Sequence, residues 1–141
     1  MERGTTLVVD TGPLVAFVDR RDPDHDRCAA LIEEAREPLI VPQLTIAEAM
    51  HLIGRRHPVD VELRLLADFV AGNFFTEPVR EADWLRIAEL VEQYADLPLG
   101  TVDASVVAAA ERLGATTIAT LDRRHFSVVR PRHLESFELL P

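Results

Sequence analysis

The sequence contains no lysine, and that absence excludes several kinds of site at once. All 15 basic residues are arginine. A P-loop nucleotide hydrolase needs the lysine of its GK[ST] motif to reach the nucleotide phosphates, so this class is excluded. A receiver domain is disfavoured for the same reason, because it too uses a lysine beside its acidic pocket.

Cysteine and long apolar runs are also scarce. Cys28 is the single cysteine, so the chain cannot form an internal disulfide, and this usage fits an intracellular setting. No apolar run approaches the roughly 20 residues needed to span a bilayer. The opening residues, MERGTTLVVD, lack the basic region and long apolar core of a signal peptide. We therefore expect a cytoplasmic protein without a membrane partner.

Positive charge is scarce as well, since the formal net charge is −9 at pH 7. Proteins that bind nucleic acid through bulk electrostatics are usually basic. A nucleic-acid partner would therefore require local arginines and a bound cation to offset the repulsion. Hydrophobic residues, by contrast, make up 48% of the 141 residues. This share is enough for a packed core in one ordinary domain.

Segments with helical periodicity alternate with short β-branched segments along the chain. The pattern predicts strands over residues 6–9, 39–41, 74–76, 116–121 and 137–140. It predicts helices over residues 12–19, 22–36, 45–56, 60–71, 81–95 and 101–113. Strands separated by helices favour a parallel sheet covered on both faces. We therefore expect an α/β fold, a three-layer α/β/α sandwich with a mainly parallel central sheet, formed as a single domain over residues 1–141.

Two of these predicted strands end in an aspartate, a charge that a buried strand would not normally carry. Asp10 follows the strand over residues 6–9, and Asp122 follows the strand over residues 116–121. In open parallel sheets, ligands bind beyond the carboxyl ends of the strands. Two further acids, Glu48 and Asp103, lie near predicted helix starts. If the strands are neighbours, these acids meet at one rim of the sheet.

Each acid also has a purely structural interpretation. Asp10 could cap the helix that follows it, and Asp122 could cap the turn RRHF. Thr45 and Glu48 match a capping box, and Asp103 could complement the helix macrodipole. Taken one at a time, the four acids leave both interpretations open.

Taken together, four carboxylates at one rim would repel one another strongly. Two carboxylates about 4 Å apart cost roughly 4 kcal/mol at an effective dielectric of about 20. Such a cluster must either bind protons or hold a cation. An all-oxygen, all-carboxylate donor set selects a hard ion, Mg²⁺ or Mn²⁺, over zinc.

Four segments, in this order, carry a family resemblance over nearly the whole chain: VVDTGPLVAF, TIAEAMHL, DLPLGTVDASVVAAAERLG and TIATLDRRHF. They resemble the PIN-domain family, and in particular the VapC-type ribonuclease toxins of bacterial toxin–antitoxin pairs. The resemblance implies hydrolysis of RNA phosphodiester bonds with Mg²⁺ or Mn²⁺ as the ion. By motif, Asp10, Glu48, Asp103 and Asp122 would be the catalytic and metal-binding acids. It also implies a VapB-like antitoxin and a homodimer.

Residues beside these acids are further candidates. Arg123 and Arg124 directly follow Asp122 and could bind RNA backbone phosphates, with a solvated, salt-bridged face as the alternative. His125 could meet a phosphate, although a packed or capping role is the first interpretation. Asp96, in YADLPLG, is a spare acid near the same loop, with a turn role as the first interpretation.

An apolar stripe at helical spacing lies within the predicted helix over residues 81–95. It consists of Trp84, Leu85, Ala88 and Val91. Packing in the core is the first interpretation of this stripe, and a dimer face is the second.

Two other functions compete with a nuclease. A haloacid-dehalogenase-like, Mg²⁺-dependent phosphatase needs a DxD-type motif and usually a lysine, but here Asp10 is followed by Thr11 and Gly12, and lysine is absent. A catalytically inactive PIN-like module that binds RNA or protein is the second alternative. The presence of acids at all four motif positions argues against it.

Overall fold

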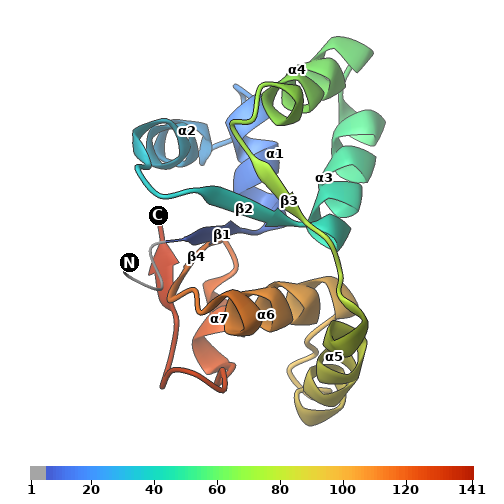
Figure 1. Ribbon diagram of the computed structural model, residues 1–141. Helices are drawn as coiled ribbons and strands as arrows, with labels where there is room; N and C mark the ends of the chain where they lie inside the picture. Colours follow the sequence, from blue (N-terminus) through green and yellow to red (C-terminus); the bar gives the residue numbers. More distant parts are fainter. Residues whose placement is uncertain (1–5) are drawn as a thin grey trace.

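The computed structural model describes residues 6–141, and within them a parallel sheet lies between two layers of helices (Figure 1). The sheet has five strands in the order β3-β2-β1-β4-β5, and every neighbouring pair is parallel. The strands are β1 (Leu7–Val9), β2 (Leu39–Pro42), β3 (Phe75–Glu77), β4 (Thr117–Ala119) and β5 (Glu138–Leu140). The predicted three-layer α/β/α fold with a parallel sheet is confirmed.

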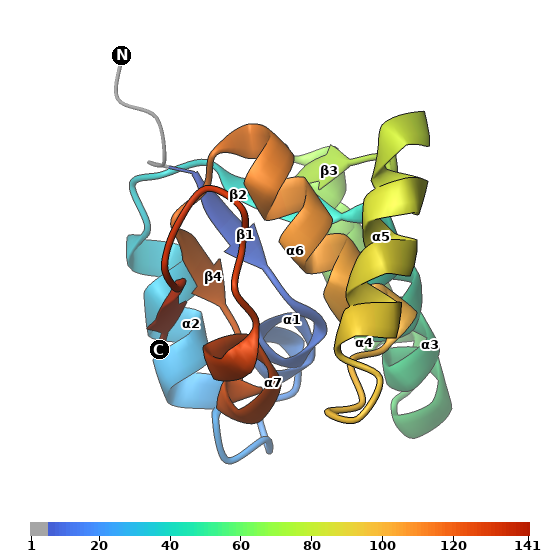
Figure 2. The ribbon, with the colours of Figure 1, turned by 90° about the horizontal axis from the view of Figure 1, so that it is seen from below.

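Helices cover both faces of the sheet (Figures 1 and 2). One face carries α1 (Thr11–Val18), α2 (His25–Glu34), α3 (Gln43–Arg56) and α4 (Val59–Val70), and the other carries α5 (Glu81–Gln93), α6 (Thr101–Leu113) and α7 (Arg123–Val128). Because side chains alternate along a strand, Val9 packs into the core beneath α1–α4, whereas Val8 packs into the core beneath α5–α7. Two cores therefore hold the central strands rigidly from both sides.

Helix α6 is largely buried, as its small and apolar sequence predicts. Residues 104–110 are all buried. The helix ends at Gly114, which has a φ of 68°, a left-handed conformation that glycine adopts without strain. Although α6 is apolar, no helix within residues 6–141 is long and apolar enough to cross a membrane.

Several helix starts differ from the sequence-based expectations, and α1 and α4 begin one residue earlier than expected, at Thr11 and Val59. Helix α2 begins at His25 rather than at residue 22, and α3 begins at Gln43 rather than at residue 45. Thr45 thus lies inside α3, where it is fully buried, so the capping-box interpretation of Thr45 and Glu48 is wrong. The segment RRHF, expected to be a turn, belongs to α7. Such short, polar segments carry little periodicity by which a helix could be recognised.

The apolar stripe on α5 is mostly exposed, and of its four residues only Val91 packs against the core. Trp84 is 51% exposed and Leu85 is 70% exposed, so the core interpretation is wrong for both. The buried face of α5 instead carries Asp83, Ile87 and Leu90. An acid can stand on this inward face because an arginine of α6 pairs with it, a contact that the sequence pattern does not reveal. The dimer-face interpretation stays a prediction.

Candidate functional site

The four predicted acids line one open pocket at the carboxyl ends of β1 and β4. The pocket has a volume of about 410 Å³ and is lined by Asp10, Thr11, Gly12, Glu48, Asp103, Leu121 and Asp122. The acids come from the end of β1, from α3, from α6 and from the segment after β4. The convergence expected from the parallel topology is therefore observed. The catalytic and metal-binding roles of the acids stay predictions.

Strand pairing places Asp10 against the end of β4. Strands β1 and β4 are direct neighbours with Val9 opposite Ala119, and the Asp10 amide donates to the Ala119 carbonyl over 2.9 Å. A Cβ atom at Gly12 would lie 3.3 Å from Leu121. The glycine of the DTG motif therefore allows the start of α1 to pack closely on the chain that leads to Asp122.

Thr120 connects two of the acids and was not identified from the sequence. Its hydroxyl donates to Oδ2 of Asp10 over 2.9 Å and accepts the backbone N–H of Asp122, also over 2.9 Å. Thr120 is 1% exposed. Asp10 stands at the N-cap position of α1 but makes no N-cap side-chain hydrogen bond within residues 6–141. The one sequence signal for Thr120 is a hydroxyl residue two positions before an acid at the end of a buried strand.

Asp122 both lines the pocket and caps a helix, and its catalytic and metal-binding roles stay predictions. It lines the pocket, and it caps α7 because its Oδ1 accepts the backbone N–H of His125 over 3.0 Å. The His125 ring adds a second contact, in which Nδ1 lies 2.5 Å from Oδ2 of Asp122. The capping interpretation of Asp122 is thus confirmed, whereas His125 is the residue that Asp122 caps. These contacts do not exclude a place in the site.

Burial and mutual repulsion dominate the electrostatics of the pocket. Burial raises the pKa of Asp10 to about 6, and the negative charges of Asp103 and Glu48 add to the rise. Burial also raises the pKa of Asp103, and the charges of Asp122 and Glu48 contribute. Ligand atoms of Asp103, Asp122 and His125 lie within 4.8 Å of one another. The site therefore favours a bound proton or cation over four free charges.

Comparison with known proteins identifies the family. The family model for the PIN domain matches residues 7–130, a range that includes all four acids. This chain belongs to the PIN domain family. It is 34% identical over 135 residues to ribonuclease VapC26 of Mycobacterium tuberculosis, a match that covers 96% of this chain and 100% of that protein. The resemblance to VapC-type ribonucleases is thereby confirmed.

Solved structures share the fold of this PIN domain. VapC20 of Mycobacterium tuberculosis, described as a sarcin-ricin loop cleaving toxin, matches with a TM-score of 0.74 at 18% identity, over 79% of this chain and 86% of that one. VapBC2 of Rickettsia felis, bound to a DNA fragment from its promoter, matches with a TM-score of 0.70 at 14% identity, over 96% and 99%. At these identities the likeness shows the fold alone.

The two arginines after Asp122 differ in their surroundings. The Arg123 guanidinium donates to the backbone carbonyls of Leu139 and Pro141, at 3.3 and 2.5 Å, which ties α7 to the end of β5. Arg124 is exposed, and its guanidinium has no hydrogen-bond or ion-pair partner in the described part of the chain. Arg124 is therefore the freer of the two to meet a phosphate. Asp96 does not line the pocket of the PIN domain.

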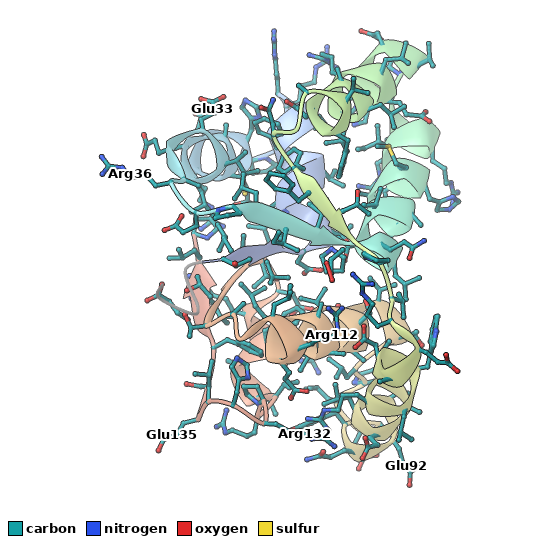
Figure 3. All side chains as sticks on the ribbon, viewed as in Figure 1. Glu33, Arg36, Glu92, Arg112, Arg132 and Glu135 are labelled. Carbon is teal, nitrogen blue, oxygen red and sulfur yellow. The ribbon has the colours of Figure 1, made fainter. Side chains whose placement is uncertain are left out.

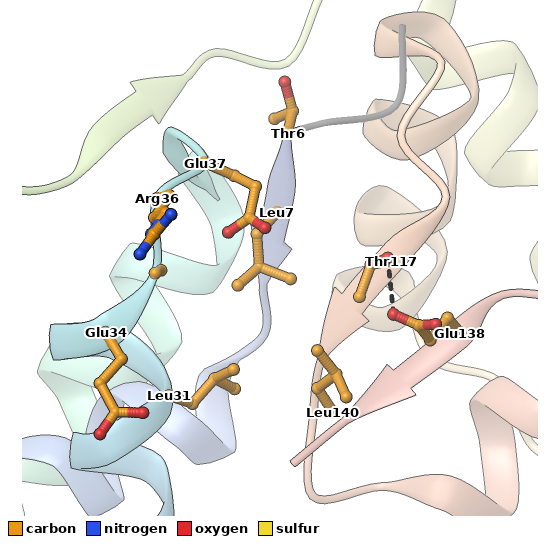
Figure 4. Close-up of a pocket in the computed structure, with 10 residues that line it drawn as sticks. Thr6, Leu7, Leu31, Glu34, Arg36, Glu37, Thr117, Glu138 and Leu140 are labelled. Carbon is orange, nitrogen blue, oxygen red and sulfur yellow. Dashed lines mark hydrogen bonds between the residues drawn. The ribbon is translucent and has the colours of Figure 1, made fainter. Parts of the chain in front are cut away.

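A second hollow lies at the opposite, amino ends of the strands (Figure 4). Its volume is about 500 Å³, and none of the four acids lines it. Leu31 of α2 and Leu140 of β5 lie on opposite sides of it, and a 3.3 Å hydrogen bond joins Thr117 to Glu138 at its wall. The larger of these two pockets is therefore not the one that the four acids line.

Proposed function

We propose that this PIN domain is a Mg²⁺- or Mn²⁺-dependent endoribonuclease, and that it is the toxin of a VapBC-type toxin–antitoxin pair. The observation that carries the proposal is the meeting of Asp10, Glu48, Asp103 and Asp122 in one pocket. A relative with 34% identity is named as a ribonuclease. That name supports RNA as the substrate class.

The residues present fit a hard divalent ion. Burial raises the pKa of both Asp10 and Asp103. The charges of the neighbouring acids of the pocket raise both pKa values further. Carboxylate oxygens are the donors that Mg²⁺ and Mn²⁺ prefer. Asp10 and Asp103 would hold the ion directly, with Glu48 and Asp122 binding it directly or through its waters. A bound ion of this kind lowers the pKa of a water and offsets charge on the scissile phosphate.

The chain's own groups have positioning roles in this chemistry, and no side-chain nucleophile is required. The Ser105 hydroxyl, near Asp103 in sequence, donates to the Val102 carbonyl over 2.6 Å. The Thr120 hydroxyl is held between Asp10 and Asp122. Both hydroxyls are therefore engaged. The exposed guanidinium of Arg124 would bind a backbone phosphate of the RNA next to the pocket.

The proposed partner, an antitoxin, is inferred by analogy with related proteins. A toxin–antitoxin complex from Klebsiella pneumoniae shares the fold of this chain. By analogy, a VapB-like antitoxin would bind this chain and cover the acidic pocket. The homodimer, the cytoplasmic location and the single domain over residues 1–141 stay predictions.

Cleavage of structured RNAs tests the enzymatic part of the proposal. Wild type, Asp10→Asn and Asp103→Asn are assayed in EDTA, in Mg²⁺ and in Mn²⁺. Asp60→Asn is the matched control, since Asp60 is exposed on α4 and does not line the pocket. We expect metal-dependent cleavage that falls at least about 100-fold in both pocket variants, because each removes a ligand charge worth several kcal/mol of transition-state stabilisation. Cleavage without metal, or full activity in Asp10→Asn, would contradict the mechanism.

Other outcomes point to the alternatives. RNA binding without cleavage under any metal condition would favour the inactive PIN-like module. Release of phosphate from small phosphomonoesters without RNA cleavage would favour the phosphatase. The toxin role is tested separately by expression in bacteria. Growth arrest should require Asp10, should be relieved by a co-expressed VapB-like antitoxin, and should coincide with new RNA 5′ ends.

A further inference from the structure

His125 contacts both oxygens of a candidate metal ligand. Its backbone N–H donates to Oδ1 of Asp122 over 3.0 Å, and its ring Nδ1 lies 2.5 Å from Oδ2. An ionised carboxylate only accepts hydrogen bonds, so Nδ1 carries the hydrogen in this contact. Hydrogen bonds at both oxygens restrict the rotation of the carboxylate. Asp122 therefore presents one preferred direction to the pocket.

The ring contact is well isolated and can be tested cleanly. Nε2 of His125 is buried and has no hydrogen-bond partner within residues 6–141. Within residues 6–141, the contact of Nδ1 with Asp122 is thus the single hydrogen bond of the His125 ring. One ring nitrogen also lies within 4.8 Å of ligand oxygens of Asp103 and Asp122. The ring therefore stands beside two acids from different elements.

We propose that His125 is a positioning residue of the divalent-ion site, and that it acts through Asp122. The inference rests on the proposed function, because it assigns a role within the same pocket. Groups that orient metal ligands by hydrogen bonds typically contribute about 10–100-fold to metal affinity or activity. The backbone N–H fixes one oxygen of Asp122 in any variant that keeps α7. The ring supplies the second bond, which sets the orientation.

Three substitutions separate the ring's hydrogen bond from its bulk. His125→Asn places an N–H donor near the position of Nδ1 but removes the rest of the ring. His125→Phe keeps an aromatic ring without a donor, and His125→Ala removes both. His57→Phe is the matched control, because His57 pairs with Asp19 at 3.3 Å and neither residue lines the acidic pocket.

The readouts are the Mn²⁺ dissociation constant, kcat, KM and thermal stability of untagged protein. Free Mn²⁺ is measured by electron paramagnetic resonance. We expect His125→Phe and His125→Ala to weaken Mn²⁺ binding about 10-fold or more and to lower kcat, and His125→Asn to stay within about threefold of wild type. The KM for RNA should change little. His57→Phe should leave Mn²⁺ affinity unchanged.

A double-mutant cycle tests whether His125 acts through Asp122. In an Asp122→Asn background, His125→Phe should change Mn²⁺ affinity by less than about twofold. The same loss in both backgrounds would overturn the inference, as would equal affinities for His125→Asn and His125→Phe. If Mn²⁺ binds the wild type but no His125 variant affects it, this inference fails and the proposed function stands. If the wild type binds no Mn²⁺, the proposed function itself fails and this inference falls with it.

Discussion

The Thr120 hydroxyl donates a 2.9 Å hydrogen bond to Oδ2 of Asp10, which lies 110 positions earlier in the chain. Both residues are buried, with exposures of 1% and 6%. The same hydroxyl accepts the backbone N–H of Asp122. One side chain at the end of β4 therefore orients Asp10 and fixes the start of the segment that carries Asp122.

This relationship predicts different effects for two substitutions of Thr120. Thr120→Val keeps the shape but removes the donor, so it should leave Asp10 without its hydrogen bond and reduce RNA cleavage about 10-fold or more. Thr120→Ser keeps the hydroxyl and should retain most of the activity. Single-turnover cleavage rates and Mn²⁺ affinity measure the difference. Equal rates for the two variants would show that the hydroxyl has no part in positioning Asp10.

The raised pKa of Asp10 predicts a pH-dependent stability in metal-free protein. The folded pKa is about 6 and the ordinary value is 3.8, so the folded state binds the proton more tightly. Stability should then fall as pH rises from about 4 to about 6, by at most about 3 kcal/mol. In EDTA, Asp10→Asn should be more stable than wild type at pH 8 and nearly equal to it at pH 3.5.

Urea unfolding at the two pH values checks this prediction. Asp60→Asn, at an exposed site, is the control. Its free energy of unfolding should equal that of wild type at both pH values. A stabilisation by Asp10→Asn that is equally large at pH 3.5 and pH 8 would argue against charge burial as its cause.

Arg112 is predicted to support the junction of α5 and α6 (Figure 3). Its guanidinium donates to both oxygens of buried Asp83, at 3.1 and 3.0 Å, and to Glu77 at 2.8 Å. Burial alone would raise the pKa of Asp83, but the hydrogen bonds from Arg112 and from the Arg80 backbone hold that pKa below its usual value. Arg112→Leu leaves the buried carboxylate without its charge partner and should cost about 2–3 kcal/mol.

The comparison is with Arg132→Leu, which removes the exposed contact of Arg132 with Glu89 at 3.2 Å and should cost less than about 1 kcal/mol. Chemical unfolding at pH 7 measures both. The gap between the variants should narrow as the pH falls, beginning above 3.8, the ordinary pKa of Asp83, because burial raises the pKa of an Asp83 carboxyl that has lost its arginine. Equal losses at pH 7 would show that the Arg112 contact adds nothing beyond a surface pair.

The arginines after Asp122 should differ in their effect on RNA binding. Arg124 has a free, exposed guanidinium within the described chain, so Arg124→Ala should weaken RNA binding and reduce the salt slope by about 0.7 per lost phosphate contact. Arg123 is tied to Leu139 and Pro141. Arg123→Ala should therefore lower the stability of the protein and change the salt slope of RNA binding less than Arg124→Ala does. Binding of uncleaved RNA to Asp10→Asn protein across a salt series measures this. Identical slopes for all variants would exclude a phosphate contact by Arg124.

Local sequence patterns account for much of the architecture. Alternating periodicities predicted a parallel sheet between helices, and the small apolar run of α6 predicted its burial. The placement of Asp10 and Asp122 after buried strands predicted their common rim, because parallel strands end at one edge. Boundaries were less accurate where segments are short. The start of α3 at Gln43 and the helical character of RRHF depend on packing that these few residues do not encode by themselves.

The sequence by itself determined the order of the elements and placed carboxylates at one end of the sheet. Both follow from the sequence because periodicity and strand ends are properties of neighbouring residues. Tertiary structure alone decided which side chains orient those acids. Thr120 reaches Asp10 because β1 and β4 pair with Val9 opposite Ala119, and strand register is not a local property. The same holds for the exposure of Trp84. Helix α5 packs inward with the face that carries Asp83, which pairs with Arg112 of α6, and Trp84 lies outside that face.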